Sequence, residues 1–575
     1  MNAGASGRIA ARARRPLGIL VLLAAVSTCV YAAIARLSWQ FTPDRESVER
    51  PLLAVFILLG VVFTFYLVAV FAAIRARDDR RLPAIIILTG VAFRLVTLYS
   101  WPIQEIDVYR YLWDGAVTTS GVSPYRYSPQ QVLAKSADEA LPHDLQRLVA
   151  LRERSPALAT VLSRVHYSEL PTIYPPVSQA VFAAVTLLTP QDTSVLGRIV
   201  NMKAAFVLFD LATMVVVIRL LRLAGKHIGW SVAYAWCPLV IKEIANTGHL
   251  DAVAVLLTTL ALFVAVCPLV DRRPTEKTAR RMVLGSVSAV LLALAVGAKL
   301  YPIVLAPLFV AAWARFLGWR RALPLTVGLL AMLAFLLWPM VPSRANQQAE
   351  EQQPPPAADG DLPPPPEDTV TTDPQDPSRG LKAFLRRWEM NDFLFMLLVE
   401  NLRPATNPDE RPWFTVLPEA WRARLLEAPA GWLQEDLSGT AFLLTRLVTC
   451  TALLLVVLWL VWRTNSSHDP TCWLRAAFLS LAWLWLLSPT QNPWYWTWAL
   501  PLVMFARGRA WLAMSGLALI YYLRFWFSCH WPETPVPGTG YRGTALFDFV
   551  VTWIEFGPWF AWLTVTAWRH RLQSS

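Results

Sequence analysis

The sequence is poor in charged residues, and this excludes most classes of soluble protein. Only 16% of its 575 residues are Asp, Glu, Lys or Arg, whereas soluble globular chains carry about 25%. Hydrophobic residues make up 55% of the chain and aromatic residues 12%. Apolar runs recur from Pro16 to Thr566, so the first run is not an isolated signal peptide. This composition is typical of a polytopic membrane protein.

Cysteine and the common motifs of soluble enzymes are also scarce. The six cysteines show no CxxC spacing, so they indicate neither a zinc site nor a required disulfide. The phosphate-binding P-loop pattern, HExxH and GxSxG do not occur. One GxGxxG is present at Gly538–Gly543, but it lies in a proline-rich loop outside any strand–turn–helix context, and we attribute it to chance. Without a nucleotide-binding domain, a transfer reaction would need a donor already activated in the membrane.

Basic residues occur in clusters between the apolar runs and account for the net charge of +12. Arg75–Arg81 and Arg272–Arg281 contain two such clusters. Clusters of this kind mark cytoplasmic loops of membrane proteins, so we predict a bilayer partner and no nucleic-acid partner. All the basic loops fall on one side only if the apolar segment Tyr174–Leu188 is interfacial or re-entrant and does not span the membrane.

The apolar runs predict an all-α polytopic integral membrane protein with about fourteen transmembrane helices and large non-cytoplasmic loops. We expect two additional amino-terminal helices over 1–82, a catalytic membrane core over 83–342, an outer loop with surface helices over 343–437, and carboxy-terminal helices over 438–575. The predicted spans are 16–36, 51–74, 83–100, 197–221, 228–244, 250–270, 282–298, 301–316, 322–342, 438–462, 470–488, 494–507, 510–528 and 546–568.

Two long polar stretches are predicted outside the cytoplasm. The first is the outer loop 101–172, in which Ala140–Val165 has the pattern of short amphipathic helices lying on the membrane. The second begins with Asn346–Ser378, which is rich in Pro, Asp and Glu and contains no Lys or Arg. This part predicts a disordered acidic linker. The following residues, 381–402, alternate apolar and charged residues at helical spacing and predict a helix resting on the bilayer surface.

Polar motifs gather at the non-cytoplasmic ends of the predicted spans, which suggests a site at that membrane surface. Asp107 by itself is equally well explained as a solvated carboxylate or a helix cap, but Glu105, Arg110 and several aromatic residues lie close to it in the sequence. A cation near the bilayer needs an anionic partner, so we expect Lys299 to form either an ion pair with a neighbouring carboxylate or a contact with a lipid-linked phosphate. Arg94 poses the same choice, with snorkelling to the interface as the favoured explanation.

His249 and Asp251 lie two residues apart at a predicted helix start. We interpret Asp251 as a helix cap and His249 as a contact for phosphate or sugar, and two such residues alone make a poor metal site.

Several motifs, in their order along the chain, resemble a known family. They are "DVYRYLWDG", "GVSPYRYSP", "TIYPPVSQA", "GHLDAVAVLL", "KLYPIVLAPL" and "LSPTQNPWYWTWALPL". This ordered set, from about Trp101 to Pro501, resembles glycosyltransferase family 87 and the related polyprenol-phosphomannose-dependent mannosyltransferases of the GT-C superfold. The resemblance implies an integral membrane enzyme that moves a sugar, usually mannose, from a polyprenyl monophosphate to a hydroxyl of a glycan or glycolipid outside the cytoplasm, at a bacterial cell membrane.

By motif position, the resemblance makes Asp107 the catalytic base of an inverting transfer. The leaving phosphate needs fixed positive charge, and the candidates are Arg110, Arg126, Lys299 and His249. Asp114 is expected mainly to hold the shape of the loop. The candidates for substrate contacts are Glu105, Tyr109, Tyr111, Trp113, Asp114, Tyr125, Tyr127, Tyr174, Asp251, Tyr301, Asn492, Trp494 and Tyr495.

No cofactor is certain from the sequence, although Glu105 and Asp107 could hold a divalent metal ion. The main alternative function is a transporter or flippase for a lipid-linked substrate, and a second is a scaffold that binds a lipid carrier without turnover. A transporter is expected to show repeat symmetry and broken helices near the midplane. The sequence shows neither clearly, and it places its polar motifs at one face.

Overall fold

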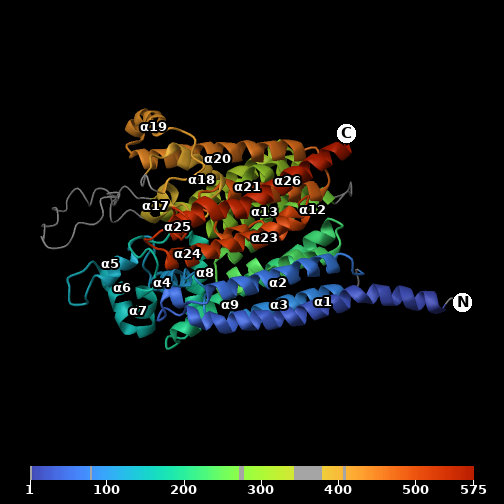
Figure 1. Ribbon diagram of the computed structural model, residues 1–575, viewed down its shortest axis with the longest axis horizontal. Coiled ribbons are helices and arrows are strands. Elements are labelled where there is room, and N and C mark those ends of the chain that lie inside the picture. The colour runs from blue at the N-terminus through green and yellow to red at the C-terminus, as the bar shows by residue number, and fades with distance from the viewer. Residues whose placement is uncertain (1–2, 78–79, 271–277, 342–377, 406–409, 575) are drawn as a thin grey trace. The chain divides into compact units, whose positions relative to one another are not determined.

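The computed structural model describes residues 3–77, 80–270, 278–341, 378–405 and 410–574. These residues form helices joined by loops and two isolated β-bridges (Figure 1). Residues 346–377 of the predicted acidic linker lie outside the described residues. The prediction of an all-α chain is confirmed for the part of the protein that the structure describes.

Ten helical segments in the described ranges are long and apolar enough to cross a membrane, and they correspond to ten of the predicted spans. They are Pro16–Phe41, Ser47–Ala73, Arg81–Leu98, Val195–Leu223, Asp251–Leu269, Thr278–Ala298, Trp319–Met340, Leu437–Thr464, Pro470–Leu487 and Ala510–His530. The last contains α23 (Ala510–Leu517), η9 (Ala518–Tyr521) and α24 (Tyr522–His530).

Two of the other four predicted spans are divided into short helices. Predicted span 228–244 is divided into η3 (Ile228–Ser231), α10 (Val232–Ala235), α11 (Pro238–Val240) and the π-helical η4 (Ile241–Asn246). Predicted span 494–507 becomes α22 (Pro493–Trp496) and η8 (Leu500–Phe505). Prolines stand near the start of α11, α22 and η8, where proline is tolerated but cannot continue a preceding helix.

Each of the two remaining predicted spans is one continuous helical run in which the type of helix changes. Predicted span 301–316 consists of η5 (Tyr301–Leu305) followed by α14 (Ala306–Leu317). Predicted span 546–568 begins with α25 (Gly543–Leu546) and the π-helical η10 (Phe547–Val551) before α26 (Thr552–Ser574). Apolar composition predicts such segments but does not reveal where backbone hydrogen bonding changes register.

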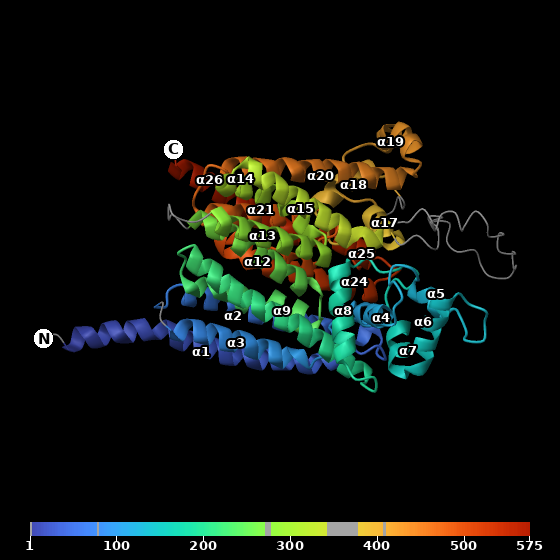
Figure 2. The same cartoon turned by 180° about the vertical axis from the view of Figure 1, so that it is seen from behind.

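The chain divides into two compact units. Unit 1 comprises Met1–Ile106, Lys203–Leu330 and Trp388–Ser575, and unit 2 comprises Asp107–Met202 and Ala331–Arg387. In unit 1, α1 (Ala3–Ser38) packs on α2 (Leu52–Ala73) and α3 (Arg81–Leu98). A second group contains α12 (Asp251–Val270), α13 (Thr278–Ala298), α14, α20 (Leu437–Thr464) and α21 (Pro470–Leu487), seen side by side in Figure 2. In Figure 1 the two chain ends, at α1 and α26, both lie on the right, away from α19 on the left.

Unit 1 buries a pair of opposite charges between helices. The Arg94 Nε of α3 donates to Asp210 Oδ2 at 2.5 Å, and both side chains are fully buried. Arg94 also donates to the carbonyls of Gly90 and Ala235, while the Tyr234 hydroxyl donates to Asp210 Oδ1. The prediction that Arg94 snorkels was wrong, because α9 (Val195–Leu223) supplies a carboxylate partner inside the protein.

Unit 2 contains the predicted first outer loop and folds into short helices. These are α4 (Val108–Thr119), α5 (Pro129–Leu133), α6 (His143–Arg154), α7 (Pro156–Ser163), α8 (Pro176–Leu188) and α17 (Arg379–Arg387). The amphipathic pattern of Ala140–Val165 thus forms the two expected short helices, α6 and α7. With 13 residues, α8 is about 20 Å long and too short to cross about 30 Å of hydrocarbon, as the predicted topology requires.

The segment predicted to rest on the bilayer surface is partly internal. Phe395 and Val399 of α18 (Leu394–Leu402) are fully buried and pack with Leu426 of α19 (Glu419–Leu433) and Phe442 of α20. The apolar face of α18 therefore packs on neighbouring helices. Just before α18, the Met390 amide donates to the Pro489 carbonyl and the Met390 carbonyl accepts from the Gln491 amide.

Candidate active site

Asp107 stands immediately before α4 in unit 2, and two tyrosines contact its carboxylate. The side chain of Asp107 does not cap the helix. Instead, its Oδ2 accepts a hydrogen bond from the Tyr174 hydroxyl at 3.1 Å and a longer one from the Tyr111 hydroxyl at 3.5 Å. Asp107 remains partly exposed. The structure thus gives it an oriented, accessible carboxylate, which is what a general base requires.

The two arginines that follow Asp107 are already engaged within unit 2. Arg110 donates through Nη1 to the carbonyl of Leu170 and through Nη2 to the carbonyls of His166 and Tyr167, at 2.8 to 3.1 Å. Arg126 forms an ion pair with Asp144 and is about half exposed. In this geometry Arg110 holds the loop before Tyr174, and a phosphate would have to compete with backbone carbonyls for its N–H groups.

The aromatic residues around Asp107 are mostly buried in packing. Tyr111 stacks on Phe182 of α8, with ring centroids 4.8 Å apart. The Tyr125 hydroxyl donates to the Tyr174 carbonyl at 2.8 Å. Tyr109 and Trp113 are also buried, at 0% and 2% exposure, whereas Tyr127 is half-buried. These contacts position the backbone and ring of Tyr174, so the aromatic cluster supports the Asp107 carboxylate indirectly.

Asp114 lies inside unit 2 and is 2% exposed. Its Oδ2 accepts a hydrogen bond from Gln179 Nε2 of α8 at 3.2 Å. Burial raises the pKa of the Asp114 carboxyl, although nearby Arg110 opposes the effect. The position fits the predicted role in holding the shape of the loop.

Unit 1 brings together a second set of predicted residues. Lys299 Nζ donates to both carboxylate oxygens of Asp251, at 2.7 and 2.8 Å, and Trp498 Nε1 donates to Oδ1 at 2.5 Å. The Lys299 ammonium also lies 4.5 Å from the centre of the Tyr495 ring. Tyr301 stacks on Trp498 with centroids 4.1 Å apart. Of the two explanations offered for Lys299, the ion pair is therefore the one present.

His249 is fully buried in unit 1, where its ring stacks on Trp494 with centroids 4.2 Å apart. His249 Nε2 lies 3.3 Å from Glu243 Oε2. Asn492 lies two residues before Trp494 and is 4% exposed. The Asn492 carbonyl accepts a hydrogen bond from Trp485 Nε1. Glu105 is partly exposed and accepts a hydrogen bond from the Tyr521 hydroxyl at 3.3 Å.

Sequence reasoning missed a buried group of charges next to His249. The Tyr522 hydroxyl donates to Glu243 Oε1 at 2.7 Å, and Lys242 Nζ lies 3.3 Å from Glu243 Oε2 and also contacts Tyr522. Lys242 and Glu243 lie in the π-helical η4, a geometry often found at functional sites. Two charges within predicted span 228–244 were the available signal, since ionisable residues inside a membrane protein are usually functional or paired.

Residues 17–315 match a protein family described as the amino-terminal domain of α-(1→6)-mannopyranosyltransferases, the MptA/B family. The match covers more than half of the chain. The chain belongs to this family. No curated protein and no solved structure matches it. The predicted resemblance to membrane mannosyltransferases is confirmed, and so is the predicted class of enzyme.

As an MptA/B family member with ten apolar helices of spanning length in its described part, the chain is a multi-pass membrane α-(1→6)-mannosyltransferase. This favours the enzyme over the transporter, flippase or scaffold. The matched region contains Asp107, His249, Asp251 and Lys299 and ends before Asn492.

Side chains that could ligate a metal ion are dispersed over the described ranges of the mannosyltransferase. In those ranges, no group of three or more His, Cys, Asp or Glu side chains is placed to hold a metal ion. Glu105 and Asp107 are separated by one residue in the sequence. Glu105 contacts a tyrosine hydroxyl, and so does Asp107.

Because the Asp392 carboxyl is buried, we predict that the stability of the protein depends measurably on pH. It is 8% exposed, and burial followed by the charge of Glu389 raises the pKa of the Asp392 carboxyl well above its usual value. The folded protein therefore binds this proton more tightly than the unfolded chain. The stabilisation is complete below about pH 4, the pKa of an unperturbed Asp, and is lost as pH rises toward the folded-state pKa.

Asp392→Asn is accordingly expected to raise the melting temperature at pH 8 by a few degrees. The decrease in melting temperature from pH 4 to pH 8 should also be smaller in this variant than in the wild type. Thermal unfolding in detergent, followed by tryptophan fluorescence, measures both effects. Asp44→Asn is the matched control, because Asp44 is exposed in the same unit. A pH profile of Asp392→Asn that superimposes on the wild-type profile would refute the assignment.

Proposed function

We propose that this mannosyltransferase has the GT-C fold and moves mannose from a polyprenyl monophosphate to a hydroxyl of a glycan or glycolipid. Asp107 acts as the base, and the reaction takes place at the non-cytoplasmic face of a bacterial cell membrane. The observation that carries the proposal is the accessible Asp107 carboxylate oriented by Tyr174 and Tyr111, in a chain of the MptA/B family. The predicted cytoplasmic position of the basic loops supports the side of the membrane.

The proposed chemistry is a single displacement. A sugar hydroxyl is a poor nucleophile at neutral pH, and a carboxylate that takes its proton during attack contributes about 10² to 10⁴ in rate. The hydroxyl oxygen attacks the anomeric carbon as the bond to the phosphate oxygen breaks. The configuration at that carbon inverts, so an α-(1→6) product implies a β-linked donor.

The leaving phosphate departs as an anion and requires positive charge rather than an acid. Among the predicted cations, we assign this role to Lys299 of unit 1, whose side chain is 14% exposed and is held in place by Asp251 and the Tyr495 ring. His249 is fully buried, and Arg110 and Arg126 are engaged within unit 2. Glu105 and Tyr495, both partly exposed, remain candidates for contacts with sugar hydroxyls.

The donor class can be tested with the purified protein in lipid nanodiscs and an α-linked mannoside as acceptor. We expect transfer of radiolabelled mannose from a polyprenyl phosphomannose and none from a nucleoside diphosphate mannose. The physical reason is that the described chain offers apolar helices for a lipid tail, while the sequence lacks a P-loop and has its one GxGxxG outside a strand–turn–helix context. Transfer from the nucleotide sugar at a comparable rate would contradict the proposed donor.

A further inference from the structure

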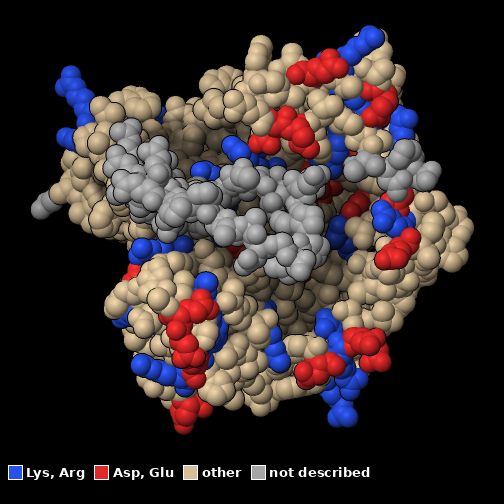
Figure 3. Space-filling model, turned by 90° about the vertical axis from the view of Figure 1, so that its left-hand side faces the viewer, with Lys and Arg blue, Asp and Glu red and all other residues tan. Residues whose placement is uncertain are grey.

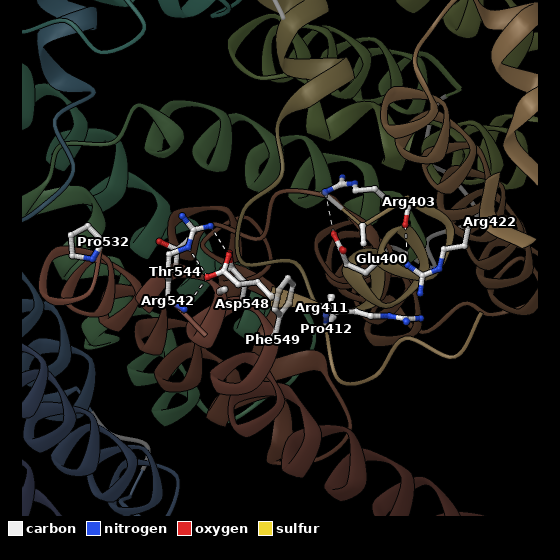
Figure 4. A pocket seen from close by; sticks show the side chains of 13 residues that line it. Glu400, Arg403, Arg411, Pro412, Arg422, Pro532, Arg542, Thr544, Asp548 and Phe549 are labelled. Carbon is white, nitrogen blue, oxygen red and sulfur yellow. Dashed lines mark hydrogen bonds and ion pairs between the residues drawn. The ribbon is translucent and has the colours of Figure 1, made fainter. Parts of the chain in front are cut away.

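A cavity of about 370 Å³ lies in unit 1, outside the region that matches the MptA/B family. It is bounded by the end of α18, the start of α19, α25 and η10, and Figure 4 shows its lining side chains. Arginines and carboxylates dominate the lining. The charged residues are Glu400, Arg403, Glu410, Arg411, Arg422, Arg542 and Asp548.

The three carboxylates of the lining are already paired. Arg542 donates to Glu410 through Nε at 2.6 Å and also through Nη2. Arg403 donates to Glu400 at 3.1 Å, and it also pairs with Glu389 outside the cavity. Asp548 accepts a bidentate contact from Arg524, which is not part of the lining, at 2.9 and 3.0 Å. Each lining carboxylate is therefore paired with another arginine. Arg411 and Arg422 are the two lining arginines that form no ion pair with a lining carboxylate.

Arg411 and Arg422 lie close together and share a carbonyl. Arg411 Nη2 and Arg422 Nε both donate to the Leu417 carbonyl, at 3.4 and 2.9 Å. Arg422 is 1% exposed, and its carboxylate contact with Glu419 is long at 3.7 Å. Its Nη2 is buried and has no hydrogen-bond partner among the described residues. An unpaired N–H on a buried cation is costly. Two neighbouring guanidinium groups also repel each other unless an anion lies between them.

We propose that this cavity binds a phosphate group carried by a membrane lipid, with Arg411 and Arg422 as its cations. The planar guanidinium group matches the geometry of phosphate oxygens, and phosphate is the common anion at a membrane surface. The face shown in Figure 3 carries both acidic and basic side chains. The preference for an anion therefore comes from the local pairing inside the cavity and not from a general excess of positive charge.

Contacts within unit 1 connect the cavity wall to Glu105, one of the predicted substrate contacts. Asp548 of the wall pairs with Arg524 of α24. One turn earlier, the Tyr521 hydroxyl contacts Glu105 and Met390 Sδ. A lipid phosphate held by Arg411 and Arg422 would therefore lie against a wall that these contacts link to Glu105 within unit 1. The proposal does not depend on the role of Asp107.

Binding of farnesyl monophosphate to the purified full-length protein in neutral detergent tests the proposal, with farnesol as the uncharged comparison. Arg411→Gln is the informative variant, because Arg411 is exposed and its loss leaves the buried Arg422 contacts intact. We expect its Kd for farnesyl monophosphate to rise about tenfold, as for loss of one charge-assisted hydrogen bond, with farnesol binding unchanged. Arg424→Gln is the matched control, because Arg424 is exposed and lies on α19, the helix that carries Arg422. This variant should bind farnesyl monophosphate like the wild type.

Two further probes distinguish the sources of the phosphate. Competition by phosphatidylglycerol, but not by inorganic phosphate, supports a lipid headgroup site. Competition by inorganic phosphate at the same concentration, or unchanged farnesyl monophosphate binding by Arg411→Gln, overturns the proposal. Asp107→Asn should bind the probe normally, so failure of this proposal and failure of the proposed mechanism are separable.

Discussion

Asp107→Asn is expected to lower the rate of mannose transfer by about 10² to 10⁴ while leaving donor binding nearly unchanged. Asparagine keeps the size of the side chain and can still contact the Tyr174 hydroxyl, but it cannot accept the proton of the attacking sugar hydroxyl. Initial rates with polyprenyl phosphomannose at saturating acceptor measure the loss. A donor-binding assay on the same preparation measures what is retained.

Asp138→Asn is the matched control, since Asp138 is an exposed carboxylate of unit 2. Tyr174→Phe removes the 3.1 Å hydrogen bond to Asp107 but keeps the ring, and it should cause a smaller fall in rate than Asp107→Asn. Full activity of the Asp107→Asn variant would eliminate Asp107 as the base. A loss of donor binding equal to the loss of rate would instead make Asp107 a binding residue.

Arg94→Met is expected to destabilise the protein by about 3 to 5 kcal/mol, because it leaves the buried Asp210 carboxylate without its cation. Methionine fills a similar volume, so the effect comes mainly from the uncompensated charge. Denaturant or thermal unfolding in detergent measures the loss. The double variant Arg94→Met/Asp210→Leu should recover most of it, since no unpaired charge remains.

Leu95→Ala provides the control for this experiment, because Leu95 is the next residue of α3 and is 59% exposed. It should change stability far less than Arg94→Met. If Arg94→Met and the double variant are equally destabilised, packing rather than charge pairing explains the role of Arg94.

Much of the fold could be predicted from the sequence, because long apolar runs have few alternatives in a membrane. Ten predicted spans correspond to observed helices, and the exclusion of Tyr174–Leu188 as a span agrees with the 13-residue α8. The breaks in 228–244 and 494–507 were not evident, because apolar composition does not report π-helical or 3₁₀ turns. The burial of α18 was also missed, since an amphipathic pattern fits a packed helix as well as a surface helix.

The residues of the candidate site could be predicted from the sequence, but the contacts between them could not. Motif order indicated Asp107 and its neighbours, but it could not show that Arg110 binds the carbonyls of the 166–170 loop. For Lys299, the sequence offered an ion pair as one possibility, but only the structure identifies Asp251 as the partner. Such pairings join residues far apart in the chain, and a single sequence contains no signal for them.

The stereochemistry of the product tests the central claim most directly. Wild-type protein is given polyprenyl phosphomannose of defined anomeric configuration, and the new linkage is read by NMR from the one-bond coupling at the anomeric carbon. Single displacement assisted by Asp107 predicts an α-(1→6) product from the β-linked donor and no turnover of the α-linked donor. An α-linked product formed from the α-linked donor would show retention and contradict the proposed mechanism.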